Sequence, residues 1–247
     1  MNDFCILIPS RIGSTRLPNK PLADICGKTM IGRVIDQAKK TGCNNIVVCT
    51  DSDEILAISQ NCGVKAILTD PSLPSGSDRI YKAYYGLGID CEFIINLQGD
   101  MPNIDPEIII NTYRMLKRNK DCDIATTVFE ISRPEEINNP NIVKAVLSIK
   151  PNEFQEHRAI YFTRSIAPYT KNNDVFYHHV GIYGYRRDAL KKFVELEPSY
   201  LEKRESLEQL RALENDMKIY AKIINKMPIS VDTADDLEIA RNYFLNL

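Results

Sequence analysis

A chain of 247 residues is long enough to bury a large core, and α/β folds of this size are often one unit. Its 31 Lys and Arg residues against 33 Asp and Glu give a formal net charge of -2, which excludes the bulk positive field typical of nucleic-acid-binding proteins. The first residues lack the basic region of a signal peptide, and no stretch approaches the ~18 apolar residues of a membrane span. We therefore expect a cytoplasmic protein with no membrane and no nucleic-acid partner.

The cysteines favour a reducing compartment. They are odd in number, contain no C-x-x-C pair and stop halfway along the chain, at Cys5, Cys26, Cys43, Cys49, Cys62, Cys91 and Cys122. A set of this kind predicts reduced and mostly buried thiols.

Through the first half of the chain, apolar β-rich runs alternate with helical patterns. The predicted strands are FCILIP at 4–9, NNIVVCT at 44–50, VKAIL at 64–68 and EFIINL at 92–97. The predicted helices lie around 30–40, 53–61, 78–85 and 106–117. Such alternation predicts a parallel sheet with helices on both faces.

The second half is less regular. Its predicted strands are DIATTVF at 123–129, NIVKAVLSI at 141–149, HHVGIYGYR at 178–186 and KIYAKII at 218–224. One helix is expected over 201–214, and another follows the turn VDTADDL at the end of the chain. Because no repeat or Gly/Ser linker marks a boundary, we predict one α/β domain over residues 1–247 with a mixed, mainly parallel sheet.

The loop that follows the first predicted strand carries three cations and no acid. Arg11, Arg16 and Lys20 lie there among small residues, at the edge of the sheet where ligands bind in open α/β folds. Arg as a planar fork and Lys as a point charge suit phosphate oxygens. The loop is neither a Walker motif nor G-x-G-x-x-G. Three solvated surface cations remain the alternative interpretation.

Two further strand ends carry acids. EFIINL runs directly into QGDMP, whose Asp100 can bind Mg²⁺, although a turn-forming Asp after Gly is the alternative. Near the C-terminus, VDTADDL offers Asp232, Asp235 and Asp236, but Asp232 followed by Asp235 strongly favours a helix N-cap with an acid in the first turn.

The stretch PSGSDRI opens a predicted helix. It places Ser75, Gly76, Ser77 and Arg79 at the start of that helix. Short polar side chains at a helix start are typical of a cap and equally of a loop that recognises a base. The two interpretations stay open at this point.

Taken in order, the motifs ILIPSRIGSTRLPNKPL, SGSDRI, NLQGDMP, NPNIVK, YFTRSIAP, HVGIYGYR, LEQLR and VDTADDL resemble the 3-deoxy-manno-octulosonate cytidylyltransferases (CMP-Kdo synthetases) over nearly the whole chain. The resemblance implies a nucleotide-diphospho-sugar transferase-like fold. It implies a cytoplasmic, Mg²⁺-dependent enzyme, usually a homodimer, that joins CTP and Kdo to give CMP-Kdo and pyrophosphate for lipopolysaccharide biosynthesis. Phosphoryl chemistry of this kind needs positioning and charge neutralisation, which explains a cationic loop without an acid.

The resemblance also implies roles for individual residues. Arg11, Arg16 and Lys20 would hold the triphosphate, with Lys20, Asp100 and Arg11 as catalytic residues. Asp100 and Asp232 would bind Mg²⁺. The cytosine or its ribose would be surrounded by Ser75, Gly76, Arg79 and Gln98, and Kdo by Arg164, His179, Tyr183, Glu208 and Gln209. For His179 and Glu208, a satisfied strand histidine and an ordinary helix acid remain the alternatives.

The sequence departs from the family pattern in three places. Met101 stands where members usually have Glu, SGSDR replaces SGTER, and the stretch from Arg164 to His179 is short. Met101 cannot coordinate Mg²⁺. Activation of 8-amino-Kdo or a sialic acid, or non-catalytic nucleotide-sugar binding, remain the alternatives to Kdo activation.

Overall fold

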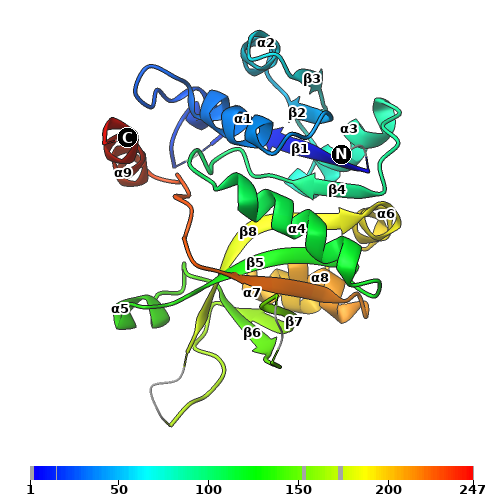
Figure 1. The fold of residues 1–247 in the computed structure, drawn as a ribbon, viewed down its shortest axis with the longest axis vertical. Helices are drawn as coiled ribbons and strands as arrows, with labels where there is room; N and C mark the ends of the chain where they lie inside the picture. Colours follow the sequence, from blue (N-terminus) through cyan, green and yellow to red (C-terminus); the bar gives the residue numbers. More distant parts are fainter. Residues whose placement is uncertain (1–2, 15, 152–153, 172–174, 247) are drawn as a thin grey trace. The chain divides into compact units, whose positions relative to one another are not determined.

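The computed structural model describes residues 3–14, 16–151, 154–171 and 175–246 (Figure 1). The chain divides into two compact units. Unit 1 comprises Met1–Ile110 together with Pro228–Leu247, and unit 2 comprises Asn111–Met227. The C-terminal segment therefore returns to the first unit. The expectation of a single domain over the whole chain stays a prediction.

The strands described in unit 1 form a parallel sheet in the order β3-β2-β1-β4. They are β1 (Phe4–Ser10), β2 (Ile46–Thr50), β3 (Lys65–Leu68) and β4 (Phe93–Asn96). β1, β2 and β4 are nearly continuous buried runs, as expected for strands covered on both faces. The register pairs Ser10 with Thr50 and Leu7 with Asn96, so the carboxyl ends of these strands meet at one edge.

The longer helices of unit 1 begin where a hydroxyl side chain caps them. They are α1 (Met30–Lys40), α2 (Asp53–Asn61), α3 (Gly76–Gly86) and α9 (Ala234–Leu245), and a 3-10 turn, η1 (Lys20–Leu22), follows the cationic loop. Each α-helix follows a Ser or Thr that accepts the backbone N–H three residues further on: Thr29, Ser52, Ser75 and Thr233. α4 (Pro106–Arg118) spans the sequence boundary between the units.

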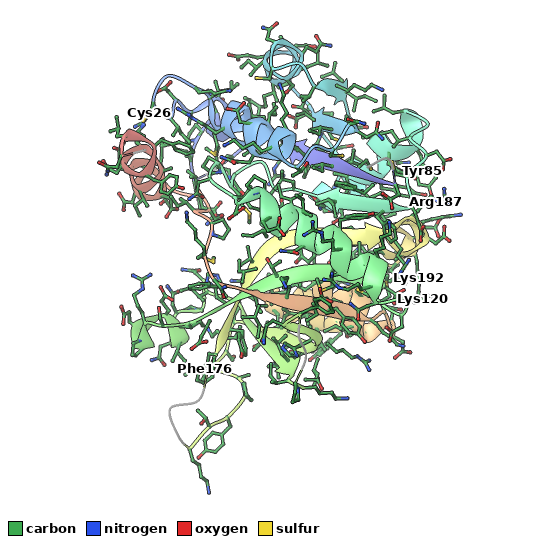
Figure 2. The ribbon with its side chains drawn as sticks, viewed as in Figure 1. Cys26, Tyr85, Lys120, Phe176, Arg187 and Lys192 are labelled. Atoms are coloured by element: carbon green, nitrogen blue, oxygen red, sulfur yellow. The ribbon has the colours of Figure 1, made fainter. Side chains whose placement is uncertain are left out.

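The C-terminal helix is anchored to the segment between η1 and α1. Leu237 and Ala240 of α9 pack in an apolar cluster with Ile25, Met30 and Val231. Figure 2 shows Cys26 of the same segment beside α9, where its thiol Sγ donates to the carbonyl of Arg241 at 3.4 Å. α9 is therefore held against the segment that follows η1.

The strands of unit 2 run in both directions. They are β5 (Ile124–Glu130), β6 (Lys144–Ser148), β7 (Glu156–Thr163), β8 (Tyr177–Arg186) and β9 (Ile219–Ile224), in the order β8-β5-β9-β7-β6. β5 and β9 are parallel, whereas the β5–β8, β7–β9 and β6–β7 pairs are antiparallel. The predicted α/β class with a mixed sheet is confirmed.

Two predictions for unit 2 were incomplete. The helix expected over 201–214 is broken into α7 (Tyr200–Glu205) and α8 (Gln209–Glu214), because Ser206 adopts the left-handed conformation with φ of 54°. The sequence interpretation also missed β7, α5 (Pro134–Ile137) and α6 (Arg187–Glu195). The break is important for the candidate sugar residues, because it places Gln209 at the first position of a helix.

Candidate active site

A cavity of about 340 Å³ opens at the carboxyl edge of the unit 1 sheet. Its lining includes the ends of β1 and β4, the loop before η1, the start of α3 and the segment before α9. All nine residues predicted to bind the nucleotide or the metal line this cavity: Arg11, Arg16, Lys20, Ser75, Gly76, Arg79, Gln98, Asp100 and Asp232. The structure therefore brings together a set that spans most of the sequence.

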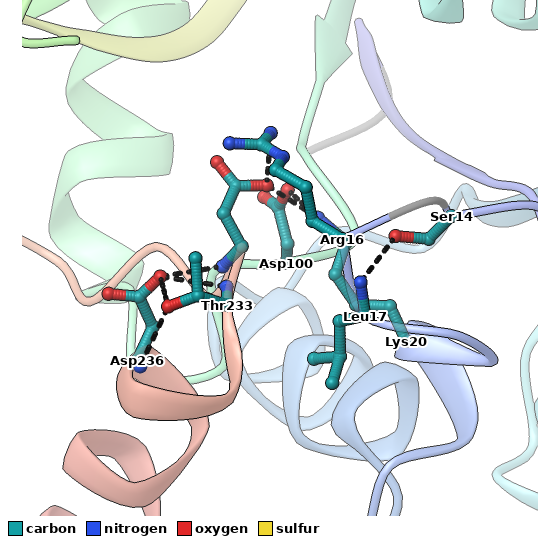
Figure 3. A network of polar contacts seen from close by, with 8 residues as sticks. Ser14, Arg16, Leu17, Lys20, Asp100, Thr233 and Asp236 are labelled. Carbon is teal, nitrogen blue, oxygen red and sulfur yellow. Dashed lines mark hydrogen bonds and ion pairs between the residues drawn. The ribbon is translucent and has the colours of Figure 1, made fainter.

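The ammonium group of Lys20 lies between the two predicted metal-binding carboxylates (Figure 3). Lys20 Nζ donates to Asp100 Oδ2 at 2.7 Å and to Asp232 Oδ1 at 3.0 Å. Arg16 also pairs with Asp232 Oδ1, at 3.0 Å. Burial lowers the pKa of Lys20, but attraction and hydrogen bonds from the two carboxylates outweigh it and raise that pKa above its ordinary value. Lys20 is thus a fixed positive charge in the cavity.

The cationic loop is held in place by an acid that the sequence interpretation missed. Asp51, directly after β2, accepts the backbone N–H of Ile12 through Oδ1 at 2.9 Å. Its Oδ2 lies 3.5 Å from Arg79, whose guanidinium is also bonded to Thr69 Oγ1. Asp51 thus connects the loop and the end of β2 to Arg79 of α3, which is only 2% exposed and also lines the cavity. The available signal was an Asp close to the carboxyl end of a buried strand, which is also what singled out Asp100.

Gly99, next to Asp100, allows the segment after β4 to approach the backbone of β1 closely. A Cβ atom at this position would lie 3.0 Å from the carbonyl oxygen of Pro9 and 3.6 Å from Ser10 Oγ. The obstructing carbonyl belongs to the backbone of β1, so it cannot move aside cheaply. A glycine here therefore brings the end of β4 against the end of β1, and Gln98 and Asp100 flank that contact.

Ser75 acts as the N-cap of α3 and also lines the cavity. Its Oγ accepts the backbone N–H of Asp78 at 3.1 Å and donates to Asp78 Oδ2 at 2.6 Å. The predicted cap is confirmed. Recognition of a base by this loop stays a prediction.

The N-cap alternative for Asp232 was wrong. The cap of α9 is Thr233, which forms a capping box with Asp236. Asp232 precedes the cap, and its carboxylate is directed to Lys20 and Arg16 instead. Its side chain is therefore placed for ligand chemistry at the cavity.

The carboxylates fit a divalent cation that is completed by substrate. Asp100 and Asp232 each place one oxygen on a common point, now occupied by Lys20 Nζ. Mg²⁺ usually takes one or two protein carboxylates and completes its shell with water and phosphate oxygens. Among the described residues, no group of three or more His, Cys, Asp or Glu side chains could hold a metal by itself. The donor set therefore suits a metal that arrives with a phosphate ligand.

In unit 2, most of the predicted sugar-binding residues form one cluster. His179 and Tyr183 lie on β8, and their ring centroids are 5.4 Å apart. Gln209 begins α8, with Nε2 at 3.5 Å from His179 Nδ1. Glu208 precedes it at the N-cap, and its charge helps to raise the pKa of the Tyr183 hydroxyl, after burial and Tyr185.

His179 is a neutral imidazole in this environment. Burial, and to a smaller extent His178, lowers its pKa to about 3. The hydroxyl of Thr126 donates to the carbonyl of Ile182 at 2.7 Å, so it can accept from His179 Nε2 at 3.0 Å. Nδ1 is then an acceptor for the Gln209 amide or for a ligand hydroxyl.

Arg164 is engaged differently from the rest of the predicted sugar set. Its guanidinium donates to the carbonyls of Glu205 at 2.8 Å, Pro140 at 3.0 Å and Ser206 at 3.4 Å. These bonds connect the end of β7 to the corner between α7 and α8. Lys144, fully buried, donates to the carbonyl of Arg164 at 3.0 Å. The predicted contact of Arg164 with a sugar carboxylate stays a prediction.

The departures from the family pattern have limited structural consequences where they are described. Met101 is 5% exposed and packs as an apolar side chain beside Asp100, so it is not placed as a metal ligand. The short stretch from Arg164 to His179 includes 172–174, which lie outside the described residues. The seven cysteines are thiols, and five of them are buried, as predicted.

None of the described helices combines enough length and apolar character to cross a bilayer.

Comparison with known proteins gives a consistent result. The family model described as cytidylyltransferase matches residues 5–219. The 3-deoxy-manno-octulosonate cytidylyltransferase of Chelativorans sp. (strain BNC1) is 50% identical over 240 residues, covering 96% of this chain and 94% of that protein. The protein of the same name from Brucella canis is 49% identical over 239 residues, with coverage of 96% and 94%.

Solved structures agree with the sequence relatives. A structure of CMP:2-keto-3-deoxy-manno-octonic acid synthetase in complex with CTP matches with a TM-score of 0.90 and 36% identity, covering 98% of each chain. The structure of apo UDP-glucose pyrophosphorylase matches with a TM-score of 0.69 at 14% identity, which shows the shared fold. The chain belongs to the 3-deoxy-manno-octulosonate cytidylyltransferase family of nucleotidyltransferases.

Proposed function

We propose that the protein is a cytidylyltransferase that joins CTP and Kdo to give CMP-Kdo and pyrophosphate. The anomeric hydroxyl of Kdo attacks the α-phosphorus of CTP, the bond to the bridging oxygen of the β-phosphate breaks, and the hydroxyl proton passes to solvent. The observation that carries the proposal is the unit 1 cavity, in which Lys20 and two carboxylates lie beside Arg11 and Arg16.

The cationic residues serve the nucleotide. Lys20, with its raised pKa, stays protonated and neutralises charge on the triphosphate and on departing pyrophosphate. Arg16 is more exposed and supports the outer phosphates, while Arg11 lines the same cavity. Positioning and charge compensation of this type account for most catalysis of phosphoryl transfer.

Asp100 and Asp232 would hold Mg²⁺ when CTP is bound. Bound there, the cation supplies charge neutralisation and orientation of phosphate oxygens. The same two carboxylates accept from Lys20 Nζ in this structure, so the lysine and the cation would both lie beside the triphosphate. Met101 needs no part in this arrangement.

The cluster on β8 and α8 serves the sugar. Kdo carries a carboxylate and several hydroxyls, which require hydrogen-bond donors and acceptors at fixed positions. His179 Nδ1 accepts and the Gln209 amide donates, while Tyr183 keeps its hydroxyl proton because burial raises its pKa. Arg164 would supply the local positive charge for the sugar carboxylate.

The wider setting follows from the family. We place the protein in lipopolysaccharide biosynthesis, in the cytoplasm and as a homodimer. Size-exclusion chromatography with light scattering tests the dimer, and a monomeric mass at micromolar concentration would contradict it.

Pyrophosphate release is the test of the proposed activity. With CTP and Mg²⁺, we expect turnover with Kdo that exceeds turnover with 8-amino-Kdo or N-acetylneuraminate. UTP should be a poor replacement for CTP, since a site built for an exocyclic amine leaves polar groups unpaired against a carbonyl. Preference for another acidic sugar would reassign the substrate. CTP binding without turnover on any of these sugars would leave a nucleotide-sugar-binding protein.

A further inference from the structure

Asp232 occupies a coil position, yet its carboxylate must be placed as accurately as one on a strand. The preceding residues of this coil are fixed by acceptors from the segment that follows β4. The backbone N–H of Ile229 donates to Asn103 Oδ1 at 2.7 Å, and that of Val231 donates to the carbonyl of Asp100 at 3.0 Å. Asn103 is 8% exposed and Val231 is fully buried. The segment that carries Asp232 is thereby bonded to the segment that carries Asp100.

Asp236 in α9 fixes the backbone of Asp232 and of the next residue, Thr233. Oδ2 of Asp236 accepts the N–H of Asp232 at 3.1 Å, the N–H of Thr233 at 2.9 Å and the Thr233 hydroxyl at 2.8 Å (Figure 3). In a capping box, the only bond required of the N3 side chain, here that of Asp236, is the one to the N-cap N–H. The additional bond to Asp232 exceeds what helix capping requires and acts on the residue that reaches the cavity.

We propose that Asp236 and Asn103 are positioning residues, which hold the Asp232 carboxylate beside Asp100 and Lys20. The inference rests on the proposed function, because its consequence is the affinity of this carboxylate pair for a divalent cation with CTP. Asn103 bonds to the backbone of Ile229, and Asp236 bonds to the backbone of Asp232 and to the backbone and hydroxyl of Thr233. Because these bonds hold the segment that carries Asp232, both residues act through Asp232. Anchoring groups behind a metal ligand typically contribute roughly 10- to 100-fold to metal affinity.

Asp235 provides a matched control for Asp236. It lies in the same first turn of α9, carries the same charge and is exposed. Asp235→Asn and Asp236→Asn therefore remove equal charge near the same helix end, but only the second weakens the anchor of Asp232. Asn103→Ala removes the other anchor without changing charge.

The experiment measures binding of Mn²⁺ by electron paramagnetic resonance, with the full-length protein and CTP but without sugar, so that no turnover occurs. We expect Asp232→Asn, Asp236→Asn and Asn103→Ala to weaken Mn²⁺ binding, the latter two by roughly tenfold, and Asp235→Asn to stay within about twofold of the parent. Melting curves of all variants identify any loss of folded protein at the temperature of the assay.

Combined variants separate positioning from general destabilisation. If Asp236 acts through Asp232, the pair Asp232→Asn with Asp236→Asn binds Mn²⁺ no more weakly than Asp232→Asn alone. A further tenfold loss in the pair, or equal binding by the Asp235 and Asp236 variants, overturns the inference while leaving the proposed function intact. Unchanged binding in Asp232→Asn overturns the metal role of Asp232 itself and the inference with it.

Discussion

Lys20 and Arg16 both contact Asp232, but their side chains differ in exposure, 17% for Lys20 and 65% for Arg16. A charge-assisted hydrogen bond contributes about 1.5–3 kcal/mol, whereas exposed ion pairs contribute about 0–1 kcal/mol. We therefore expect Lys20→Met to lower kcat/KM for CTP by about 10- to 150-fold, and Arg16→Met to lower it only a few-fold.

Steady-state kinetics with each substrate varied in turn measures this difference. The KM for Kdo should stay near its parent value in both variants. Parent-like kinetics for CTP in Lys20→Met would remove Lys20 from the nucleotide site, whatever the result for Arg16.

His179 makes folding sensitive to acid. Its pKa of about 3 in the folded protein lies below the ordinary value of 6.5, so the unfolded chain binds a proton that the folded protein does not. Stability from this group is complete above pH 6.5 and falls as the pH drops toward 3, by up to about 1.4 kcal/mol per pH unit.

Urea unfolding between pH 7 and pH 4 checks this expectation against His179→Gln. The variant lacks the buried imidazole, so its free energy of unfolding should decline less steeply with acidification. Identical slopes in the two proteins would mean that folding does not lower the pKa of His179.

The residues predicted to bind the nucleotide and the metal line one cavity, which the strand-end rule could anticipate because it is geometric. A cation or acid that follows a buried parallel strand lies at the edge of the sheet where ligands bind, whatever the position of that strand in the sheet. Asp51 was missed although it satisfies the same rule. The cap of α9 was misassigned because Asp232 and Thr233 both have capping side chains, and only the backbone angles distinguish them.

At the level of elements, the corner between α7 and α8 sets where Gln209 lies. Ser206 has φ of 54°, a conformation that costs a residue with a Cβ roughly 1–2 kcal/mol and costs glycine little. Ser206→Gly should therefore preserve or raise the free energy of unfolding. Ser206→Val should lower it by about 1–2 kcal/mol and raise the KM for Kdo but not for CTP.

Chemical denaturation and kinetics on the same preparations test the corner. If Ser206→Val changes neither stability nor the KM for Kdo, the corner does not position the sugar cluster. The glycine variant controls for loss of the serine hydroxyl.

Strands and helices could be predicted from the sequence where their apolar pattern was continuous. They were missed where polar residues are buried together with a partner. β7 begins with Glu156, His157 and Arg158, a polar stretch that does not read as a strand. Glu156 is nevertheless buried, because its carboxylate bonds to Arg118 and to Asn119 Nδ2. Ser206 hid the helix break, since Ser is compatible with a helix and its left-handed angle is imposed by the fold.

For the whole molecule, the α/β class followed from the alternation of strands and helices, but the division of the chain did not. Unit 1 is completed by Pro228–Leu247, which returns after all of unit 2. The pairing of β5 with β9 is likewise long-range, because the paired residues Ile124 and Ile219 are 95 positions apart. Neither composition nor local pattern encodes such a return, because it depends on which buried surfaces match after folding.

The fate of the anomeric oxygen of Kdo is the most direct test of the proposed attack on the α-phosphorus of CTP. Kdo labelled with ¹⁸O at this hydroxyl is incubated with CTP, Mg²⁺ and the protein, and the products are separated for mass spectrometry. We expect CMP-Kdo that carries the heavy oxygen and pyrophosphate that does not, because the sugar hydroxyl attacks the α-phosphorus. Heavy oxygen in pyrophosphate, or release of unlabelled CMP without a sugar nucleotide, would contradict it.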